Sequence, residues 1–253
     1  MYAIKVTGIY TPILTNVGYI YISYLRPGLR LIGFDPNTKE ITTAEVIKVR
    51  RSLTVSSSHA GIHAVRYWLV VTKDDKAIDK DGDMVNVCDL TEAELNFCFP
   101  RELFEGQHNP HICKSGKLGL LHWNPEFRKV REIHSEISTN SRPLAQGFFK
   151  ITFEEIKKFL GNRKRVEINI KSILVLLNFL EMALRAMKED SVKLIPAKDR
   201  YSLSFELRDQ EKEGLVKVNS SIYCEPIKDI ITVSNTVITE KPIYFLTAGL
   251  VRG

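Results

Sequence analysis

The sequence predicts a mainly β module built from both ends of the chain, with an α+β insert between them. Short runs of β-branched and aromatic residues, separated by turn residues, fill residues 1–98 and return in residues 222–253. Residues 99–221 differ, because they include a segment with helical periodicity. Lys and Arg outnumber Asp and Glu by 22 to 16 in this middle part and equal them, 14 to 14, elsewhere, so the whole net charge of +6 lies there. A neutral outer part that encloses a basic insert is typical of two distinct modules.

Residues 1–98 and 222–253 are expected to form many short strands. Turn signals such as Arg26-Pro-Gly28 separate the runs, and residues 73–82 predict a charged turn. The serines at 56–58 predict a loop. The expected strands are Ile13–Thr15, Tyr19–Ile22, Leu29–Phe34, Ala44–Val49, Arg66–Thr72, Ile230–Val233, Thr236–Thr239 and Pro242–Leu246. Regular turns between short strands predict a closed all-β module.

The insert is expected to mix helices and strands. Phe153–Leu160 predicts a short helix that ends at Gly161, and Arg165–Ile170 alternates like a strand. A second helix should run from an N-cap at Ser172 to about Asp190, with most of its faces apolar. After it, Val192–Ile195 and Tyr201–Arg208 are expected to form an antiparallel pair.

The opening of the chain, Val6-Thr-Gly-Ile-Tyr-Thr-Pro-Ile-Leu-Thr15, closely resembles the start of an intein. Inteins are self-splicing domains of the Hint fold, a horseshoe of strands, and they begin with a Cys or Ser nucleophile just before such a run. Here that position falls on Lys5 or Val6, depending on the gap chosen. Neither side chain has a thiol or hydroxyl that could attack a carbonyl. The resemblance therefore implies a Hint-like module that lacks its first catalytic group.

Three further segments resemble inteins in the same order along the chain. In the block Leu69–Leu90, Thr72 is kept, but the position of the His that polarises the first scissile amide is Asp75. A carboxylate cannot donate a proton at neutral pH as an imidazolium can. Residues 226–233 resemble a late intein strand. At the C-terminus the closing His-Asn pair becomes Arg252 and Gly253, so no Asn is present to cyclise. An unrelated β-barrel with similar turns is the alternative.

The insert has a second resemblance, to the LAGLIDADG homing endonucleases that many inteins carry between their Hint halves. Gln146–Phe153 lies where that family ends its metal-binding helix, and the acidic positions fall on Lys150 and Thr152. Hard divalent cations need oxygen ligands, and a Lys repels them. The length admits one degenerate repeat in residues 99–221. A generic insert of helices and strands is the alternative.

Two groups of residues are candidate sites in the insert. The first would hold a metal, but it has no Cys-x-x-Cys knuckle, and a polar linker is the alternative; it consists of Cys98, His108, His111, Cys113 and His122. The second would bind phosphates through positive charge; it consists of Arg163, Lys164, Arg165, Lys198, Arg200 and Arg208. Acidic residues at 206, 209, 211 and 213 dilute that charge, so a solvated ribbon of mixed charge is the alternative.

Together these features predict a catalytically inactive, intein-derived protein that is retained for binding to DNA or to a nucleic-acid-bound complex. The alternative is a structural subunit of a larger assembly, such as a virion or a polymerase, and the resemblance to selfish elements favours a viral or phage origin. An active homing endonuclease would need groups that the sequence lacks. No cofactor, small-molecule substrate or membrane partner is expected, and a homodimer is compatible with the sequence.

The expected location is intracellular, in the cytoplasm or nucleoid, with association with a virion as the other option. Met1–Tyr10 alternates and lacks the apolar core of a signal peptide, so secretion is not expected. Ile173–Met187 is too short and too polar to span a membrane. The four cysteines show no framework spacing, which favours a reducing compartment.

Overall fold

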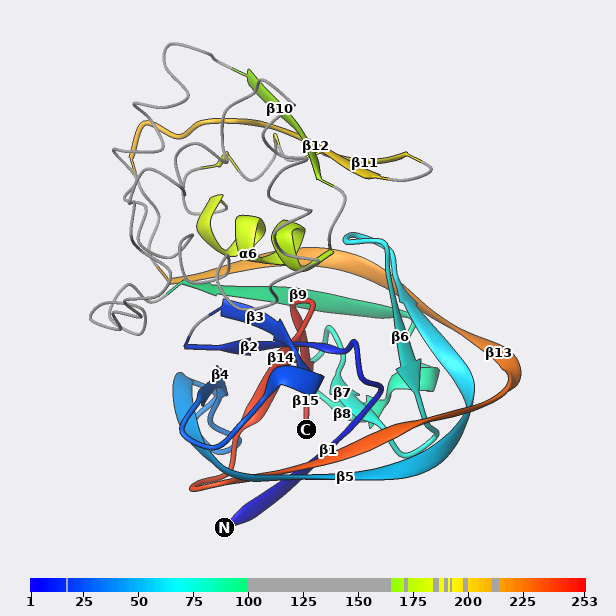
Figure 1. Cartoon of the computed structure of the whole chain (residues 1–253). Coiled ribbons are helices and arrows are strands. Elements are labelled where there is room, and N and C mark those ends of the chain that lie inside the picture. The colour runs from blue at the N-terminus through cyan, green and yellow to red at the C-terminus, as the bar shows by residue number, and fades with distance from the viewer. Residues whose placement is uncertain are drawn as a thin grey trace. The chain divides into compact units, whose positions relative to one another are not determined.

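The computed structural model describes residues 1–16, 18–99, 165–170, 173–183, 187–188, 191, 193–197, 200–210 and 214–253. The chain divides into two compact units. Unit 1 consists of Met1–Cys98 and Lys217–Gly253, and unit 2 consists of Phe99–Val216. Unit 1 is therefore built from both chain ends, and unit 2 is inserted between them (Figure 1).

Unit 1 is a single antiparallel sheet of twelve strands with almost no helix among its described residues. Its main path runs β1-β13-β5-β4-β14-β15-β7-β8, and the other strands attach to that path. Two 3₁₀ turns, η1 (Ile22–Tyr24) and η2 (Val87–Asp89), interrupt the strands. The strands are β1 (Tyr2–Thr7), β2 (Pro12–Thr15), β3 (Gly18–Tyr21), β4 (Arg30–Phe34), β5 (Ile41–Ile62), β6 (Tyr67–Val71), β7 (Lys76–Ile78), β8 (Met84–Asn86), β9 (Glu92–Phe99), β13 (Gly214–Thr239), β14 (Tyr244–Thr247) and β15 (Leu250–Arg252).

N-terminal and C-terminal strands alternate within this sheet. β1 pairs with β13 from Tyr2–Thr239 to Thr7–Ser234, and β13 pairs along most of its length with β5. β14 pairs with β4, and β15 pairs with β7. Figure 1 shows the blue N-terminal strands beside the orange and red C-terminal ones. Neither end of the chain can complete this sheet without the other.

The core of unit 1 follows from the alternation of its strands. On β1, Ile4 and Val6 point inward, and Lys5 between them is exposed. Their cluster includes residues from both chain ends, among them Val46, Val237 and Phe245. Burial of this much apolar surface is the main force that holds the two ends together.

The structure confirms most of the expected strands and extends two of them. The run at 44–49 is part of β5, and the two runs at 230–239 belong to one strand, β13. The loop expected at Ser56–Ser58 is wrong, because β5 continues through these serines and the Ser56 hydroxyl donates to the Val71 carbonyl over 2.6 Å. The charged turn expected at 73–82 contains β7. In both places, pairing with distant strands outweighs local turn preference.

The described part of unit 2 contains one helix and a separate three-stranded antiparallel sheet with the order β10-β12-β11. The expected antiparallel pair is confirmed as β11 (Lys193–Ala197) and β12 (Arg200–Glu206), and the expected strand is β10 (Arg165–Ile170). The expected helix is α6 (Ile173–Ala183), but its expected end near Asp190 is wrong, because Met187 pairs with Leu207 in an antiparallel β-bridge. Its Leu176 and Leu177 are fully buried. The expected helix at 153–160 lies outside the described residues.

Of the helices that the structure describes, none combines the length and the apolar character that a membrane span requires.

Candidate functional site

The position that an intein gives to its first nucleophile is part of the core. The Val6 side chain is fully buried in the apolar cluster, while Lys5 is exposed on the other face of β1. Val6 lies opposite Asn235 of β13, whose amide donates to the carbonyls of Val6 and Gly8 over 3.0 and 2.9 Å. These contacts tie β1 to β13, so Val6 serves packing and sheet pairing.

Thr72 and Asp75 form a closed turn between β6 and β7. The backbone N–H and the hydroxyl of Thr72 both donate to Asp75 Oδ2, over 2.6 and 3.1 Å. The backbone N–H of Asp75 donates in return to the Thr72 carbonyl over 3.1 Å. The Asp75 side chain is only 3% exposed. A Thr and an Asp three residues apart are suited to such a turn, because both side chains can replace backbone partners.

Arg252 brings the last strand of the chain to this turn. In β15 it lies opposite Phe245 of β14 on one side and Ala77 of β7 on the other. Its Nη2 donates to Asp75 Oδ1 in an ion pair, and its Cζ lies 5.6 Å from the centre of the Phe245 ring. We call Thr72, Asp75 and Arg252 the Asp75–Arg252 centre. Two positions to which the resemblance assigns lost catalytic histidines, Asp75 and Arg252, therefore meet in this centre, whereas Val6 lies in the apolar cluster.

The ion pair of the Asp75–Arg252 centre is closed to solvent, and Arg252 is not fully hydrogen-bonded. The Arg252 side chain is 1% exposed, and its Nε and Nη1 have no hydrogen-bond partner among the described residues. A buried pair gains its attraction only by offsetting a large loss of hydration, so such a pair is poor evidence for added stability. The loss of either partner, however, would leave the charge of the other buried without a counter-charge.

The chemistry open to this centre is limited. Both Asp75 oxygens already accept hydrogen bonds, and a guanidinium keeps its protons at neutral pH. The Thr72 hydroxyl is committed to Asp75. At Gly253, an added Cβ would lie 2.7 Å from Met84 Cε and 3.0 Å from the Tyr244 ring, so a side chain there requires both neighbours to move. The arrangement suits a structural link between β6, β7 and β15.

The candidate phosphate-binding residues are brought together only in part. In the strand register, Arg165 lies opposite Glu206, and Arg200 lies opposite Ala197. Arg208 Nε donates to the Met187 carbonyl, and Lys188 forms an ion pair with Glu206 over 3.5 Å. The described part of this ribbon is therefore mixed in charge. Arg163, Lys164 and Lys198 lie outside the described residues.

The candidate metal ligands do not form a site within the described part of the chain. Cys98 is fully buried in β9. Across the residues that the structure describes, no group of three or more His, Cys, Asp or Glu side chains could hold a metal ion. The other candidates, together with the degenerate endonuclease positions, lie outside the described residues; they are His108, His111, Cys113, His122, Lys150 and Thr152.

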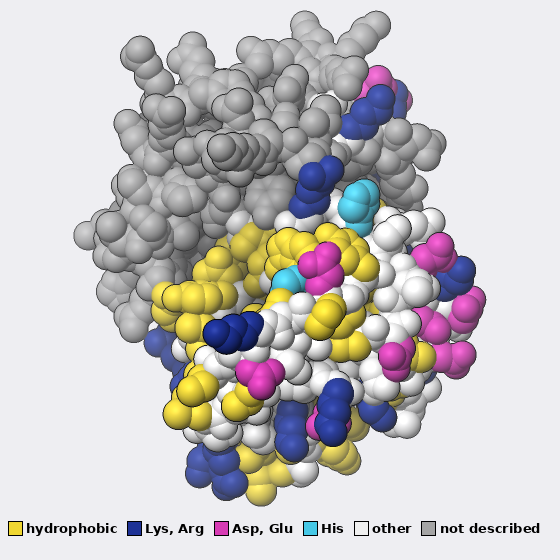
Figure 2. All heavy atoms as spheres, turned by 90° about the vertical axis from the view of Figure 1, so that its right-hand side faces the viewer, with side chains coloured by type: hydrophobic (Ala, Val, Ile, Leu, Met, Phe, Trp, Pro, Cys, Tyr) yellow, Lys and Arg dark blue, Asp and Glu magenta, His cyan; other side chains and the backbone are white. Residues whose placement is uncertain are grey.

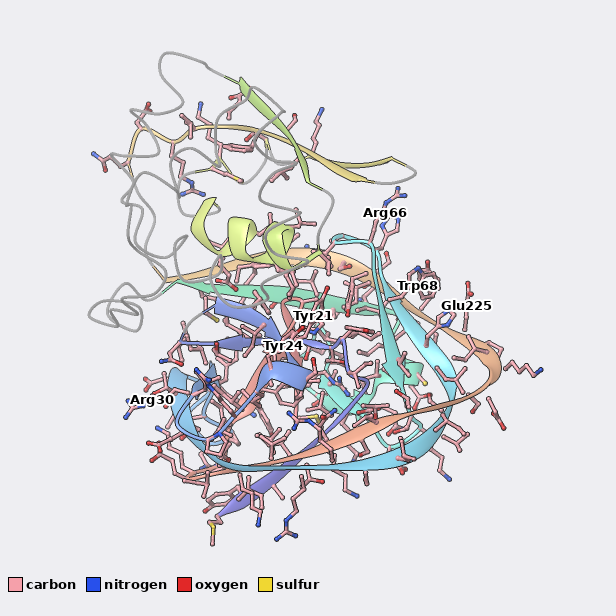
Figure 3. All side chains as sticks on the ribbon, in the orientation of Figure 1. Tyr21, Tyr24, Arg30, Arg66, Trp68 and Glu225 are labelled. Carbon is pink, nitrogen blue, oxygen red and sulfur yellow. The ribbon has the colours of Figure 1, made fainter. Side chains whose placement is uncertain are left out.

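Sequence reasoning missed an aromatic cluster on the outer face of β5, β6 and β13. Trp68 contacts His59 edge-on at 4.2 Å between ring centres and Tyr223 at 5.1 Å. Gly61 has no side chain, and an added Cβ would lie 2.7 Å from the Tyr223 ring. Figure 2 shows hydrophobic side chains gathered on this face beside a histidine and an acidic side chain, and Figure 3 labels Trp68 and Glu225 there. The sequence signal that could have revealed this cluster was the alternation of side chains along residues 67–71, in which Trp68 falls on the exposed face of β6.

From the sequence, Asp75 and Arg252 were identified only as two separate positions at which the resemblance expects a catalytic histidine. Their opposite charges were the signal that could have joined them, since buried charges are paired. No model of a protein family matches this chain, and no curated protein matches it either. The interpretation of the centre therefore depends on the residues themselves.

Proposed function

We propose that this chain is a catalytically inactive protein derived from a splicing domain, and that it functions by binding. The observation that carries the proposal is the buried Asp75–Arg252 ion pair. It occupies two positions where the resemblance to inteins places catalytic histidines. A buried valine stands where the first nucleophile would stand, which points the same way.

The arrangement of unit 1 supports the proposed Hint-like ancestry. An intein must place its two ends close together, because the bonds it breaks flank it on both sides. Here β1 pairs with β13, and β15 reaches the turn that follows β6. A chain that has kept this interweaving, but has replaced its reactive groups with packed ones, has a scaffold suited to binding.

Nucleic acid is the partner that the charge distribution favours. Without Lys217, which belongs to unit 1, residues 99–216 carry 21 Lys and Arg against 16 Asp and Glu. The excess of five positive charges falls in the inserted unit. Positive charge of this kind binds phosphates without reading the base sequence. We therefore place the binding surface on unit 2 and expect DNA, free or in a protein complex, as its ligand.

The test is a fluorescence titration of labelled duplex DNA with the full chain. Contacts to about six phosphates predict that affinity falls on the order of 10³-fold between roughly 50 and 200 mM salt. A variant with Arg163, Lys164 and Arg165 changed to Gln should bind more weakly and with a shallower salt dependence. The matched control changes Lys5, Lys48 and Arg50, three exposed residues of unit 1, to Gln and should keep the salt dependence.

Weak binding that does not depend on salt would contradict the nucleic-acid proposal. Equal losses in the two triple variants would do so as well, because they would show that only net charge matters. Any ligated product from the chain fused between two reporter proteins would overturn the proposed inactivity.

One observation favours the second candidate, a structural subunit. On the paired strands β5 and β13, Val55 lies opposite Ile231, and Leu53 lies two residues further along on the same face. These three apolar side chains are 58%, 76% and 77% exposed, respectively. A contiguous exposed apolar patch is typical of a protein interface. We call this patch the apolar ribbon and take its occupant to be a second copy of the chain.

Sedimentation velocity over a concentration series tests this candidate. Association that increases with concentration, and that is lost when Leu53 and Ile231 are changed to Lys, would support a self-assembling subunit. The control changes Lys48 and Lys228, which are exposed on the same two strands, to Gln. A monomer at every concentration would contradict it.

A further inference from the structure

Two cysteines that are 136 residues apart in sequence meet within unit 1. Cys88 belongs to η2, and Cys224 belongs to β13. The Cys224 thiol donates to the Cys88 sulfur, and the two sulfur atoms are 2.8 Å apart. Both residues are half-buried, so small molecules can reach them. Nothing in the Asp75–Arg252 centre or in the proposed binding surface uses this pair.

Regular structure holds both cysteines in place. Cys224 lies opposite Ala60 of β5 in the sheet. Next to Cys88, the Val87 N–H donates to the Asp75 carbonyl over 2.8 Å, and the Leu90 N–H closes the turn onto the Val87 carbonyl over 3.3 Å. The Ile222 N–H also donates to the Thr91 carbonyl over 2.9 Å, which ties the segment after η2 to β13. The sulfur contact is therefore a consequence of the sheet and not of a loose loop.

We infer that Cys88 and Cys224 are a disulfide site, which low-molecular-weight disulfides such as oxidised glutathione convert to a covalent bond. A disulfide has a sulfur–sulfur distance of about 2.05 Å, so closing the pair needs movement of less than about 1 Å. This modification is independent of the proposed binding function.

The reaction balances with glutathione disulfide as the oxidant. A thiolate of the pair attacks one sulfur of the oxidant, which releases one glutathione and leaves a mixed disulfide on the protein. The second cysteine loses its proton and attacks the protein-bound sulfur, which releases the second glutathione. Two protons and two electrons leave the protein, and the oxidant is reduced to two glutathione thiols.

The environment of Cys88 slows exchange that begins at this residue. Burial, together with the hydrogen bond between the Cys88 and Cys224 sulfur atoms, raises the pKa of the Cys88 thiol to about 12. Because the thiolate is the attacking species, exchange that begins at Cys88 is slow at neutral pH and faster in alkaline buffer. We therefore expect oxidation over hours at pH 7 and clearly faster oxidation at pH 9, since uncatalysed exchange takes minutes to hours.

The bond would change the connectivity of unit 1. It would join the segment that precedes the insert to the strand that follows it, so the closed loop would contain all of unit 2. Closure of a loop of this length restricts the unfolded chain strongly, and the thermal midpoint should rise by about 5–10 °C.

The experiment incubates the full chain with glutathione buffers of rising oxidised fraction, quenches free thiols by alkylation, and maps the peptides by mass spectrometry. The expected product is lighter than the reduced chain by two hydrogens and gives one cross-linked peptide that joins Cys88 to Cys224. Reduction should restore both alkylated peptides and lower the thermal midpoint again.

Two results would overturn the inference. The first is full alkylation of Cys88 and Cys224 after native protein has been held in oxidised glutathione. The second is a cross-link that instead uses Cys98 or Cys113. The variants Cys88→Ser and Cys224→Ser should each abolish the cross-link and the shift in midpoint, whereas Cys113→Ser should keep both. Because the wild-type peptide map decides the question by itself, a variant that fails to fold leaves the result intact.

Discussion

Asp75 and Arg252 form a buried structural link at two positions that the resemblance to inteins assigns to catalytic groups. The resemblance to inteins assigns both positions to histidines, which transfer protons at neutral pH. The two residues present in this chain carry opposite charges and pair with each other in the interior. An ion pair holds the same strands together as a catalytic network would, but it offers no proton to donate. Under the proposed ancestry, the same two substitutions would have removed the chemistry and added the fixed contact.

The first prediction at this scale concerns Asp75→Asn. The change removes the negative charge and leaves the buried Arg252 guanidinium uncompensated, so the free energy of unfolding should fall by about 3–5 kcal/mol. Urea denaturation measures this. The control is Glu92→Gln, which breaks the exposed ion pair between Lys80 and Glu92, 2.6 Å apart, and should leave the urea midpoint unchanged. Equal midpoints for the two variants would show that the buried pair has no structural role.

A second prediction follows from the Cys88 thiol. Its pKa is raised from 9.0 to about 12 in the folded protein, so the folded state keeps the proton that the unfolded state loses above pH 9. The unfolded state then binds fewer protons, and the contribution of Cys88 to stability is complete below pH 9 and is lost as the pH rises toward 12. Under reducing conditions, the difference in unfolding free energy between wild type and Cys88→Ser should be constant from pH 7 to 8.5 and should shrink above pH 9. A difference that does not change with pH would contradict the raised pKa.

At the scale of elements, local sequence predicted which segments form strands more reliably than how far the strands run. The turn residues near positions 26–28 and 35–38 do separate η1, β4 and β5. The lengths of β5 and β13, in contrast, come from pairing between residues about 180 apart, such as Val55 with Ile231. No local pattern contains that information. The same limit applies to the Asp75–Arg252 centre, whose members were found one by one while their contact was not.

The substitution Gly33→Ala tests the close approach of β4 and β14. Gly33 lies in β4 opposite Phe245 of β14, and an added Cβ would lie 1.8 Å from the Tyr244 carbonyl oxygen. Backbone atoms cannot give way as side chains can, so Gly33→Ala should separate β4 from β14 and lower the unfolding free energy by about 4 kcal/mol or more.

The matched control for Gly33→Ala is Gly28→Ala. Gly28 has a φ of +85° and no atom within 4 Å of an added Cβ, so this change meets only backbone strain of roughly 1–2 kcal/mol. Thermal denaturation of both variants separates the two effects. If Gly28→Ala proved the more damaging change, the close approach of β4 and β14 would be wrong.

At the scale of the whole molecule, unit 1 can fold only after both ends of the chain exist. Its sheet pairs Tyr2 with Thr239, and such non-local contacts make folding slow. The insert must therefore not prevent the two halves of unit 1 from pairing during folding. A structural basis for this lies in β9 and β13, which lead into the insert and out of it and which pair with each other.

This pairing predicts that the insert can be removed. Lys217 Nζ lies 2.7 Å from Glu94 Oε2, and further from the insert the Ile222 N–H donates to the Thr91 carbonyl over 2.9 Å, so the two strands run side by side in opposite directions. If residues 99–216 are replaced by a short turn of Gly and Asn, the strands become a hairpin, and closing the shorter loop costs less entropy.

The shortened protein should unfold cooperatively in urea with the far-UV circular dichroism of a β protein, and it should no longer bind DNA. The control replaces the same residues with a flexible Gly-Ser chain of equal length, which keeps the long connection and should give a lower unfolding midpoint than the short turn. A shortened protein that is soluble but unfolds without cooperativity would show that unit 1 depends on the insert for its fold. Retained DNA binding would instead move the binding surface onto unit 1, where the exposed arginines of β5 would be the next residues to change.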